Sequence, residues 1–202
     1  MRKMIFLLFA LLSSQATAAS LDVEVKKIEN HVETIQVKGQ GTFEYQILFE
    51  VIGKEGQTID EFAAQISPLL REWSDETHFE ACGVIATDGK KYGIQIGSAK
   101  SHIGCTNFHD LTPEGMTSTN KTIHSHGTDQ KFQVNEMDLK LMGETYGGGS
   151  YGKNTRRNFQ FMSGQDLSTF SDADFSGGGG YLATPNGGLL YQDGKRKIKK
   201  VI

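Results

Sequence analysis

Apolar and polar residues alternate along the chain in short runs, and this period of two is typical of strands with one buried face. It predicts strands at residues 32–37 and 42–51, with the glycines of residues 39–41 forming a hairpin turn between them. In the second strand, every other residue is apolar and should lie on one face: Phe43, Tyr45, Ile47 and Phe49. Residues 19–30 are polar, and we expect them to be extended or disordered.

One stretch changes to the spacing of a helix. Its apolar residues recur three and four positions apart: Ile59, Phe62, Ala63, Ile66, Leu69, Leu70 and Trp73. Thr58, followed three positions later by Glu61, fits a capping box and predicts the start of the helix. Pro68 lies inside the pattern, so we expect a kink or a junction of two helices there.

The remaining pattern predicts a mixture of strands and one more helix. Strands are expected at residues 78–86, 92–97, 121–126, 181–184, 189–192 and 195–202. Residues 127–170 read as an insertion with a helix at 135–146, a glycine-rich linker at 147–152 and a strand at 158–162. Helices and strands do not alternate strictly, which predicts an α+β fold with a mixed sheet.

The N-terminus has the pattern of a secretory signal peptide. Arg2 and Lys3 precede an apolar run, and Ala16-Thr17-Ala18 is a small-x-small cleavage pattern. We expect a signal peptide at residues 1–18, cleavage after Ala18, a periplasmic or secreted mature chain and no later membrane span. The formal net charge is −3 and becomes more negative without Arg2 and Lys3, which argues against nucleic acid as a partner.

Cys82 and Cys105 are the two cysteines of the chain. Exported proteins fold in oxidising compartments, where two cysteines can form a disulfide. Two buried thiols would give the same sequence, so the pattern leaves the disulfide open.

Five residues from separate stretches fit a hydrolytic zinc site. His124 and His126 lie two positions apart on a predicted strand, so both imidazoles point to one face. With the carboxylate of Asp174 they would supply three ligands and leave a fourth position for water, as in catalytic zinc sites. Glu80 could act as general acid and base, and Ser171 could donate a hydrogen bond to a developing oxyanion.

Other assignments fit parts of this pattern. Ser171 and Asp174 also have the spacing that begins a short helix, which would make Ser171 a capping residue. Ser163 and Asp166 repeat the Ser-x-x-Asp spacing, although more polar residues follow them and no strand does. The remaining histidines are expected at the surface or in packing roles, with His109 as the best alternative ligand: His31, His78, His102 and His109.

These motifs resemble the JAB/MPN metalloproteases, also called the JAMM family. Glu80 begins a Glu-x-x-Gly strand, His124-Ser125-His126 follows, and Ser171-x-x-Asp174 comes last, which is the order of that family. Residues 80–85, 124–127, 170–174 and 181–187 further resemble a bacterial branch associated with Rhs and polymorphic-toxin proteins. The chain departs from the family in the long insertion between the histidines and Asp174.

The resemblance implies a cytidine-deaminase-like α/β/α fold with a mixed sheet flanked by helices. It implies a JAMM-like domain at residues 57–202, preceded by a hairpin extension at 19–56. It also implies Zn²⁺ bound by His124, His126 and Asp174, with Glu80 as general acid/base in the hydrolysis of an amide or isopeptide bond.

Two classes of function follow from these patterns. The first is an exported peptidase or amidase acting on peptidoglycan stem peptides or on a secreted or target-cell protein. The second is an inactive scaffold of the same fold that binds a peptide or serves a toxin system as an accessory protein. All five positions of the proposed site hold a suitable residue, which favours the enzyme over the inactive scaffold. The length of the insertion at 127–170 suggests a substrate-selecting lid.

Overall fold

The computed structural model describes residues 23–37, 41–126, 131–145, 160–161 and 167–202. The predicted signal peptide, the linker at 147–152 and the pair Ser163 and Asp166 lie outside these residues. The N-terminal elements are β1 (Val23–Val37), β2 (Gly41–Gly53), α1 (Ile59–Thr77), β3 (Cys82–Thr87), β4 (Tyr92–Ser98) and β5 (Thr117–Ser125). The others are β6 (Lys131–Phe132), α2 (Glu136–Thr145), β7 (Gln160–Phe161), α3 (Asp172–Ser176), β8 (Gly179–Ala183), β9 (Leu189–Asp193) and β10 (Ile198–Lys200).

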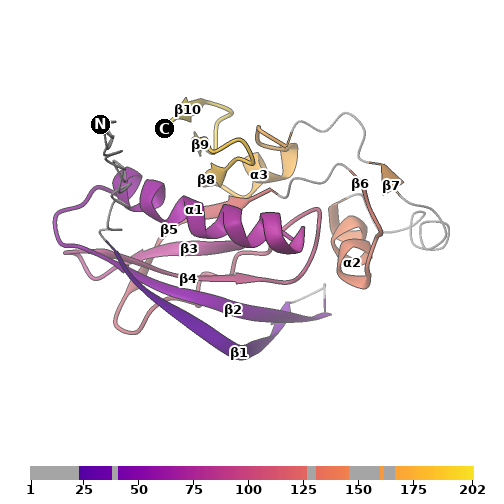
Figure 1. The fold of residues 1–202 in the computed structure, drawn as a ribbon, viewed down its shortest axis with the longest axis horizontal. Coiled ribbons are helices and arrows are strands. Elements are labelled where there is room, and N and C mark those ends of the chain that lie inside the picture. The colour runs from indigo at the N-terminus through magenta and orange to yellow at the C-terminus, as the bar shows by residue number, and fades with distance from the viewer. Residues whose placement is uncertain (1–22, 38–40, 127–130, 146–159, 162–166) are drawn as a thin grey trace, which may run out of the picture.

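The fold is α+β, as predicted, and is built on one eight-stranded mixed sheet in the order β1-β2-β4-β3-β5-β8-β9-β10 (Figure 1). Neighbouring strands are antiparallel except β5 and β8, which run parallel. Gly180 allows β8 to approach β5 closely, because a Cβ at this position would collide with the side chain of Thr122. Strands β6 and β7 form a separate two-stranded sheet within the insertion.

The N-terminal hairpin is longer than predicted and continues the main sheet. Residues 23–30, expected to be extended or disordered, belong to β1, and β2 pairs with both β1 and β4. The register with β4 shifts between Ile47 and Phe49, so the alternation of apolar residues breaks there. Phe49 therefore packs with the cluster under α1, while Tyr45 and Ile47 pack on the opposite face, which corrects the prediction of one shared face.

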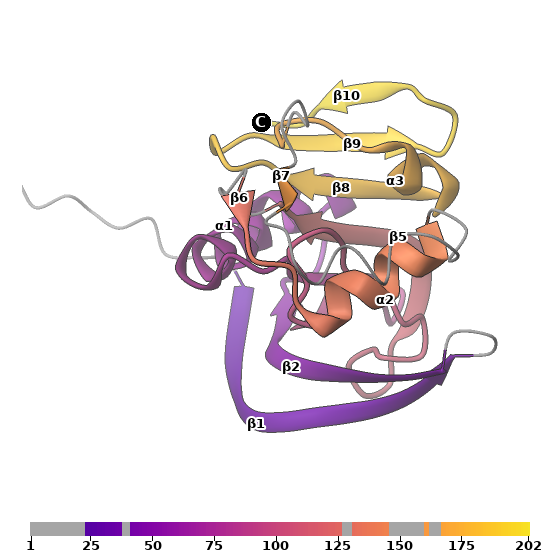
Figure 2. The same ribbon diagram turned by 90° about the vertical axis from the view of Figure 1, so that its right-hand side faces the viewer.

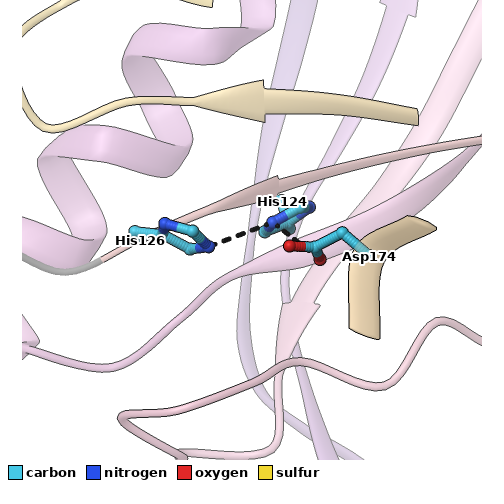
Figure 3. Close-up of side chains that lie close together, drawn as sticks. All are labelled: His124, His126 and Asp174. Carbon is cyan, nitrogen blue, oxygen red and sulfur yellow. Dashed lines mark hydrogen bonds and ion pairs between the residues drawn. The ribbon is translucent and has the colours of Figure 1, made fainter. Parts of the chain in front are cut away.

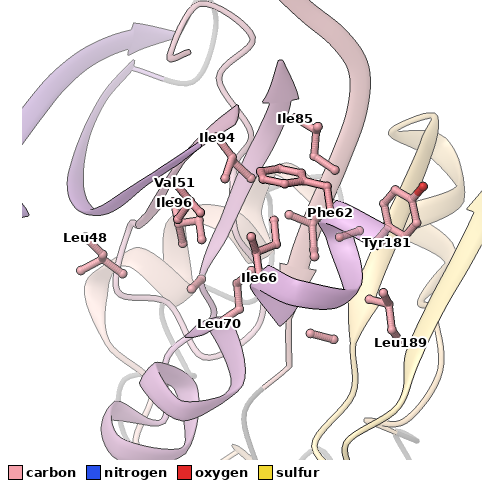
Figure 4. Packing of buried hydrophobic residues seen from close by; sticks show 14 residues of the cluster. Leu48, Val51, Phe62, Ile66, Leu70, Ile85, Ile94, Ile96, Tyr181 and Leu189 are labelled. Atoms are coloured by element: carbon pink, nitrogen blue, oxygen red, sulfur yellow. The ribbon is translucent and has the colours of Figure 1, made fainter. Parts of the chain in front are cut away.

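Helix α1 covers one face of the sheet and buries its apolar stripe, as Figure 4 shows. The capping box is confirmed: the Glu61 amide donates to Thr58 Oγ1 at 3.2 Å, and the Thr58 amide donates to Glu61 Oε2 at 2.8 Å. The helix continues through Pro68, so the expected junction of two helices is wrong. The Ser67 hydroxyl donates to the Ala64 carbonyl at 3.0 Å, which supplies a partner that the missing Pro68 amide cannot.

The opposite face of the sheet is covered by the segment that follows β4 and by α2, which lies in front of the sheet in Figure 2. Cys82 and Cys105 form a disulfide with a Cα–Cα distance of 5.9 Å, which joins β3 to this segment. Met137 of α2 packs against the same cluster. In the described residues, no helix has the length and apolar character to cross a membrane.

The insertion is attached to the core through a buried carboxylate. Asp138 of α2 is fully buried and accepts hydrogen bonds from the Ser101 hydroxyl at 2.7 Å and the His102 amide at 2.8 Å. Its second oxygen lies 2.8 Å from His102 Nδ1 and accepts from the Asn135 amide at 2.9 Å. Helix α2 is therefore docked on the core, and the lid hypothesis concerns at most the rest of the insertion.

Two predicted strand ranges were too wide. Residues 78–81 precede β3, because His78 takes a left-handed conformation (φ 67°) and ends α1 there. The last strand covers only Ile198–Lys200, because the chain turns at Gly194 and Arg196, where φ is positive.

Candidate metal centre

The paired histidines stand at the end of a central strand. In β5, His124 pairs with Cys82 of β3 on one side and with Leu182 of β8 on the other. Ile123 and Ser125 point toward α1, where the Ser125 hydroxyl lies 2.6 Å from that of Ser74. His124 and His126 therefore point to the opposite face, where they are 7% and 4% exposed.

Asp174 reaches the histidines from α3 (Figure 3). Its Oδ1 lies 3.2 Å from His124 Nε2, and His124 Nε2 lies 3.3 Å from His126 Nε2. Its Oδ2 accepts hydrogen bonds from the Ser171 amide and the Ser171 hydroxyl, both at 2.7 Å. One carboxylate oxygen thus faces the histidines while the other is held by the turn that begins α3.

The three side chains have the spacing of ligands that share one metal ion. One ligand atom from each residue lies within 4.8 Å of the other two. Zinc bonds of roughly 2.0–2.1 Å in a tetrahedral arrangement place neighbouring ligand atoms roughly 3.3 Å apart. Both measured contacts of His124 Nε2 match this separation, and the donor set of two imidazoles and one carboxylate suits several divalent metals.

The protonation of His126 follows from a hydrogen bond on its far side. His126 Nδ1 lies 3.0 Å from the Leu167 carbonyl, which can only accept, so Nδ1 carries the proton. Nε2 is then the nitrogen that can serve as a metal ligand, and it faces His124 and Asp174. Metal-binding histidines commonly have this outer hydrogen bond to a carbonyl, because it fixes the orientation of the ring.

Glu80 lies beside the cluster, just before β3. Continuing the register in which Cys82 faces His124 places Glu80 opposite His126, on the same face of the sheet. Its backbone is held on both sides, by the Ser101 carbonyl at 2.8 Å and the Ser98 hydroxyl at 2.7 Å. The Glu80 side chain is buried.

The pKa values of two carboxyl groups in the site are shifted in opposite directions. Burial raises the pKa of Glu80 well above its usual range, and the carboxylates of Asp174 and Asp138 raise it further. Burial would also raise the pKa of Asp174. The pKa is lowered overall, because the electrostatic effects of His124 and His126 and the two hydrogen bonds from Ser171 outweigh burial. The site thus favours an ionised Asp174 beside a Glu80 that holds a proton more readily than a solvated glutamate does.

Two roles were considered for Ser171: a hydrogen-bond donor to an oxyanion, and a residue that begins a short helix. Its hydroxyl donates to Asp174 Oδ2, and Ser171 occupies the N-cap position of α3. This contact orients the proposed metal ligand. Donation to an oxyanion would need a different hydroxyl rotamer and stays a prediction.

The other histidines lie outside the cluster. His31 contacts Glu33 at 2.6 Å on the surface, and His109 Nδ1 lies 3.2 Å from the Ser118 hydroxyl. His102 stacks on Phe132 with ring centroids 4.6 Å apart and contacts Asp138. Asp138 is a buried polar residue that the sequence analysis missed. The helix predicted at residues 135–146 included Asp138, but nothing local indicated that its side chain is buried.

Comparison with known proteins identifies no relative of this chain: no family model, curated protein or solved structure matches it significantly. Assignment of function therefore rests on the residues and geometry of the site.

Proposed function

We propose that this chain is an exported zinc-dependent hydrolase that cleaves an amide or isopeptide bond, with a site of the JAMM type. The observation that carries the proposal is the contact of His124 Nε2 with both His126 Nε2 and Asp174 Oδ1, at 3.3 and 3.2 Å. These distances and this donor set fit a catalytic zinc ion with three protein ligands and one open position. The motif order seen in the sequence, Glu80 then the histidines then Asp174, supports the same assignment.

The proposed reaction divides its tasks among the residues around the cluster. A zinc ion held there would polarise the scissile carbonyl and make a water molecule acidic enough to attack it near neutral pH. Glu80 would take the proton of that water and pass it to the leaving nitrogen, so that the amine would depart neutral. The buried position of Glu80 suits this role, because desolvation brings the affinity of a carboxylate for protons closer to that needed near neutral pH.

The fold is compatible with the finer assignment. A mixed sheet carries α1 on one face, and α2 docks on the other, which suits the α/β/α arrangement of cytidine-deaminase-like proteins. The N-terminal hairpin would be an addition of this chain to that core.

Export would also set the class of substrate. The disulfide between Cys82 and Cys105 suits an oxidising compartment, in agreement with the leader pattern at residues 1–18. Outside the cytoplasm, the available amide substrates include peptidoglycan stem peptides and secreted or target-cell proteins. We propose the stem peptides as the first substrates to test.

The test is metal analysis of the purified mature chain, followed by assays on a panel of muropeptides and amide-linked peptides. We expect about one zinc per chain, and hydrolysis that stops on chelation and returns on addition of zinc. A chain that binds zinc but cleaves no member of the panel would support the binding scaffold. A chain without affinity for zinc would contradict the proposal.

A further inference from the structure

We infer that the hairpin formed by β9 and β10 positions Asp174, through Gln192 and Arg196. The inference rests on the proposed function, because it assigns the residues that hold the third metal ligand in place. Asp174 lies on a helix of only five residues, Asp172–Ser176, which is too short to hold its own position. Its exact placement must come from contacts with the rest of the molecule.

Gln192 makes the inner contact. Its side chain is buried within β9, where the residue pairs with Gly180 of β8. The amide nitrogen Nε2 donates to the backbone carbonyl of Asp174 at 2.9 Å and also to the carbonyl of Gly178. Its oxygen accepts from the Gly194 amide, so both ends of the side chain are used.

Arg196 makes the outer contact from the turn between β9 and β10. Its guanidinium lies 2.8 Å from a carboxylate oxygen of Asp172 and is placed over the ring of Phe175, 5.1 Å from the centroid. Asp172 and Phe175 lie on either side of Asp174 in α3. The two side chains of the hairpin therefore hold α3 by the backbone of the ligand residue and by residues on both sides of it.

This attachment bears on metal affinity because metal bonds tolerate little displacement. Ligand distances in a well-formed site hold to about 0.2 Å, and removal of an outer hydrogen-bond partner commonly weakens metal binding by about 10- to 100-fold. Without Gln192, the carbonyls of Asp174 and Gly178 lose a buried donor. Helix α3 would then be free to shift relative to the histidines of β5.

The experiment measures zinc affinity of the full mature chain by competition with a chromophoric chelator. Gln192→Met keeps the length of the side chain but removes the donor, and we expect zinc binding to weaken by about 10- to 100-fold. Gln95→Met is the matched control, because Gln95 also lies on a strand and donates through Nε2, but to Glu50 on a different part of the sheet. We expect its affinity to match wild type.

Arg196→Ala provides a second variant that does not depend on a core substitution. We expect zinc binding to weaken by about two- to fivefold, because this contact is exposed and screened by solvent. Lys197→Ala, at the exposed neighbouring position, should leave affinity unchanged. Thermal unfolding of the metal-free chains, together with the visible spectrum of the Co²⁺ form, separates a displaced ligand from a general loss of stability.

The outcomes are distinct. If wild type binds zinc and a folded Gln192→Met chain binds it equally well with the same Co²⁺ spectrum, the inference is wrong and the proposed function stands. If Gln192→Met does not fold, Arg196→Ala decides, and unchanged affinity in that variant overturns the inference. If wild type itself does not bind zinc, the proposed function fails first.

Discussion

The two halves of the proposed metal site are held in different ways. His124 lies on β5, in the middle of the sheet, and backbone hydrogen bonds fix this strand on both sides. Asp174 lies on a short helix near the surface, and side chains hold it: Ser171 at the carboxylate and Gln192 at the backbone. The first half depends on the overall fold, whereas the second depends on a few individual contacts.

This difference predicts that mutations near the two halves will act on different quantities. Damage to the support of β5 should lower the free energy of unfolding while the folded molecules keep their histidine geometry. Damage to the support of α3 should weaken metal binding with little effect on stability. The predictions below test this separation, from the largest expected effect to the smallest.

Replacing both histidines should have the largest effect. His124→Ala combined with His126→Ala removes two of the three proposed ligands, and we expect the purified chain to contain no stoichiometric zinc by metal analysis. His109→Ala is the control, because His109 lies on the surface beside Ser118 and should leave zinc content unchanged. Full zinc content in the double variant would place the metal elsewhere in the chain.

Glu80→Gln should keep the proposed metal and remove the proposed proton carrier. We expect zinc content close to one per chain and a fall in turnover on the order of 10²–10⁴ fold, measured with the substrate found in the panel. The substitution is nearly isosteric, so the buried position should tolerate it. Loss of zinc in this variant would instead assign Glu80 to the metal ligands.

Ile123→Ala tests the strand that carries the histidines. Ile123 is fully buried beneath α1, and its truncation should lower the free energy of unfolding by about 2–5 kcal/mol through lost burial and a cavity. Urea unfolding of the metal-free chain measures this, with the exposed Ile198→Ala as a control that should change little. The zinc affinity of the folded fraction should equal wild type, and a tenfold loss there would contradict the separation of the two halves.

Of these four substitutions, Ser171→Ala should have the smallest effect. In contrast to Ile123→Ala, it should weaken zinc binding and leave stability nearly unchanged. It removes the hydroxyl contact with Asp174 Oδ2 but keeps the amide contact, so we expect zinc affinity to fall by about tenfold with nearly unchanged unfolding. Ser176→Ala, at the other end of α3, is the matched control. Stability that falls while affinity holds would make Ser171 a helix cap with no influence on the metal site.

The sequence predicted best those features that depend on neighbouring residues. The capping box of α1 and the shared face of His124 and His126 follow from spacing alone, because helix and strand periods fix where side chains point. The shared face of the two histidines could therefore be predicted without knowledge of the fold. Their closeness to Asp174 and Glu80 could not, because it depends on how distant segments come together.

The features that sequence reasoning missed depend on contacts between distant segments. Gln192 occupies an ordinary polar position in a strand, and only the return of α3 over β9 makes its amide a partner of Asp174. Pro68 predicted a kink or a junction of two helices, but α1 is one continuous helix in which the Ser67 hydroxyl donates to the Ala64 carbonyl. The register shift in β2 depends on pairing with β4, and the alternation of apolar residues before Leu48 did not predict it.

The outer edge of β1 has a consequence for how copies of this molecule meet in solution. Among the described strands, β1 pairs only with β2, so a long row of backbone donors and acceptors faces outward. A second strand could extend such an edge and begin an aggregate. The register of β1 is interrupted between Lys27 and His31, and Asn30 there takes a left-handed conformation with φ 56°. This bulge divides the edge into two shorter pieces and places the charge of Lys27 beside the break, which makes continuous pairing between two chains unfavourable and favours colloidal stability at high concentration.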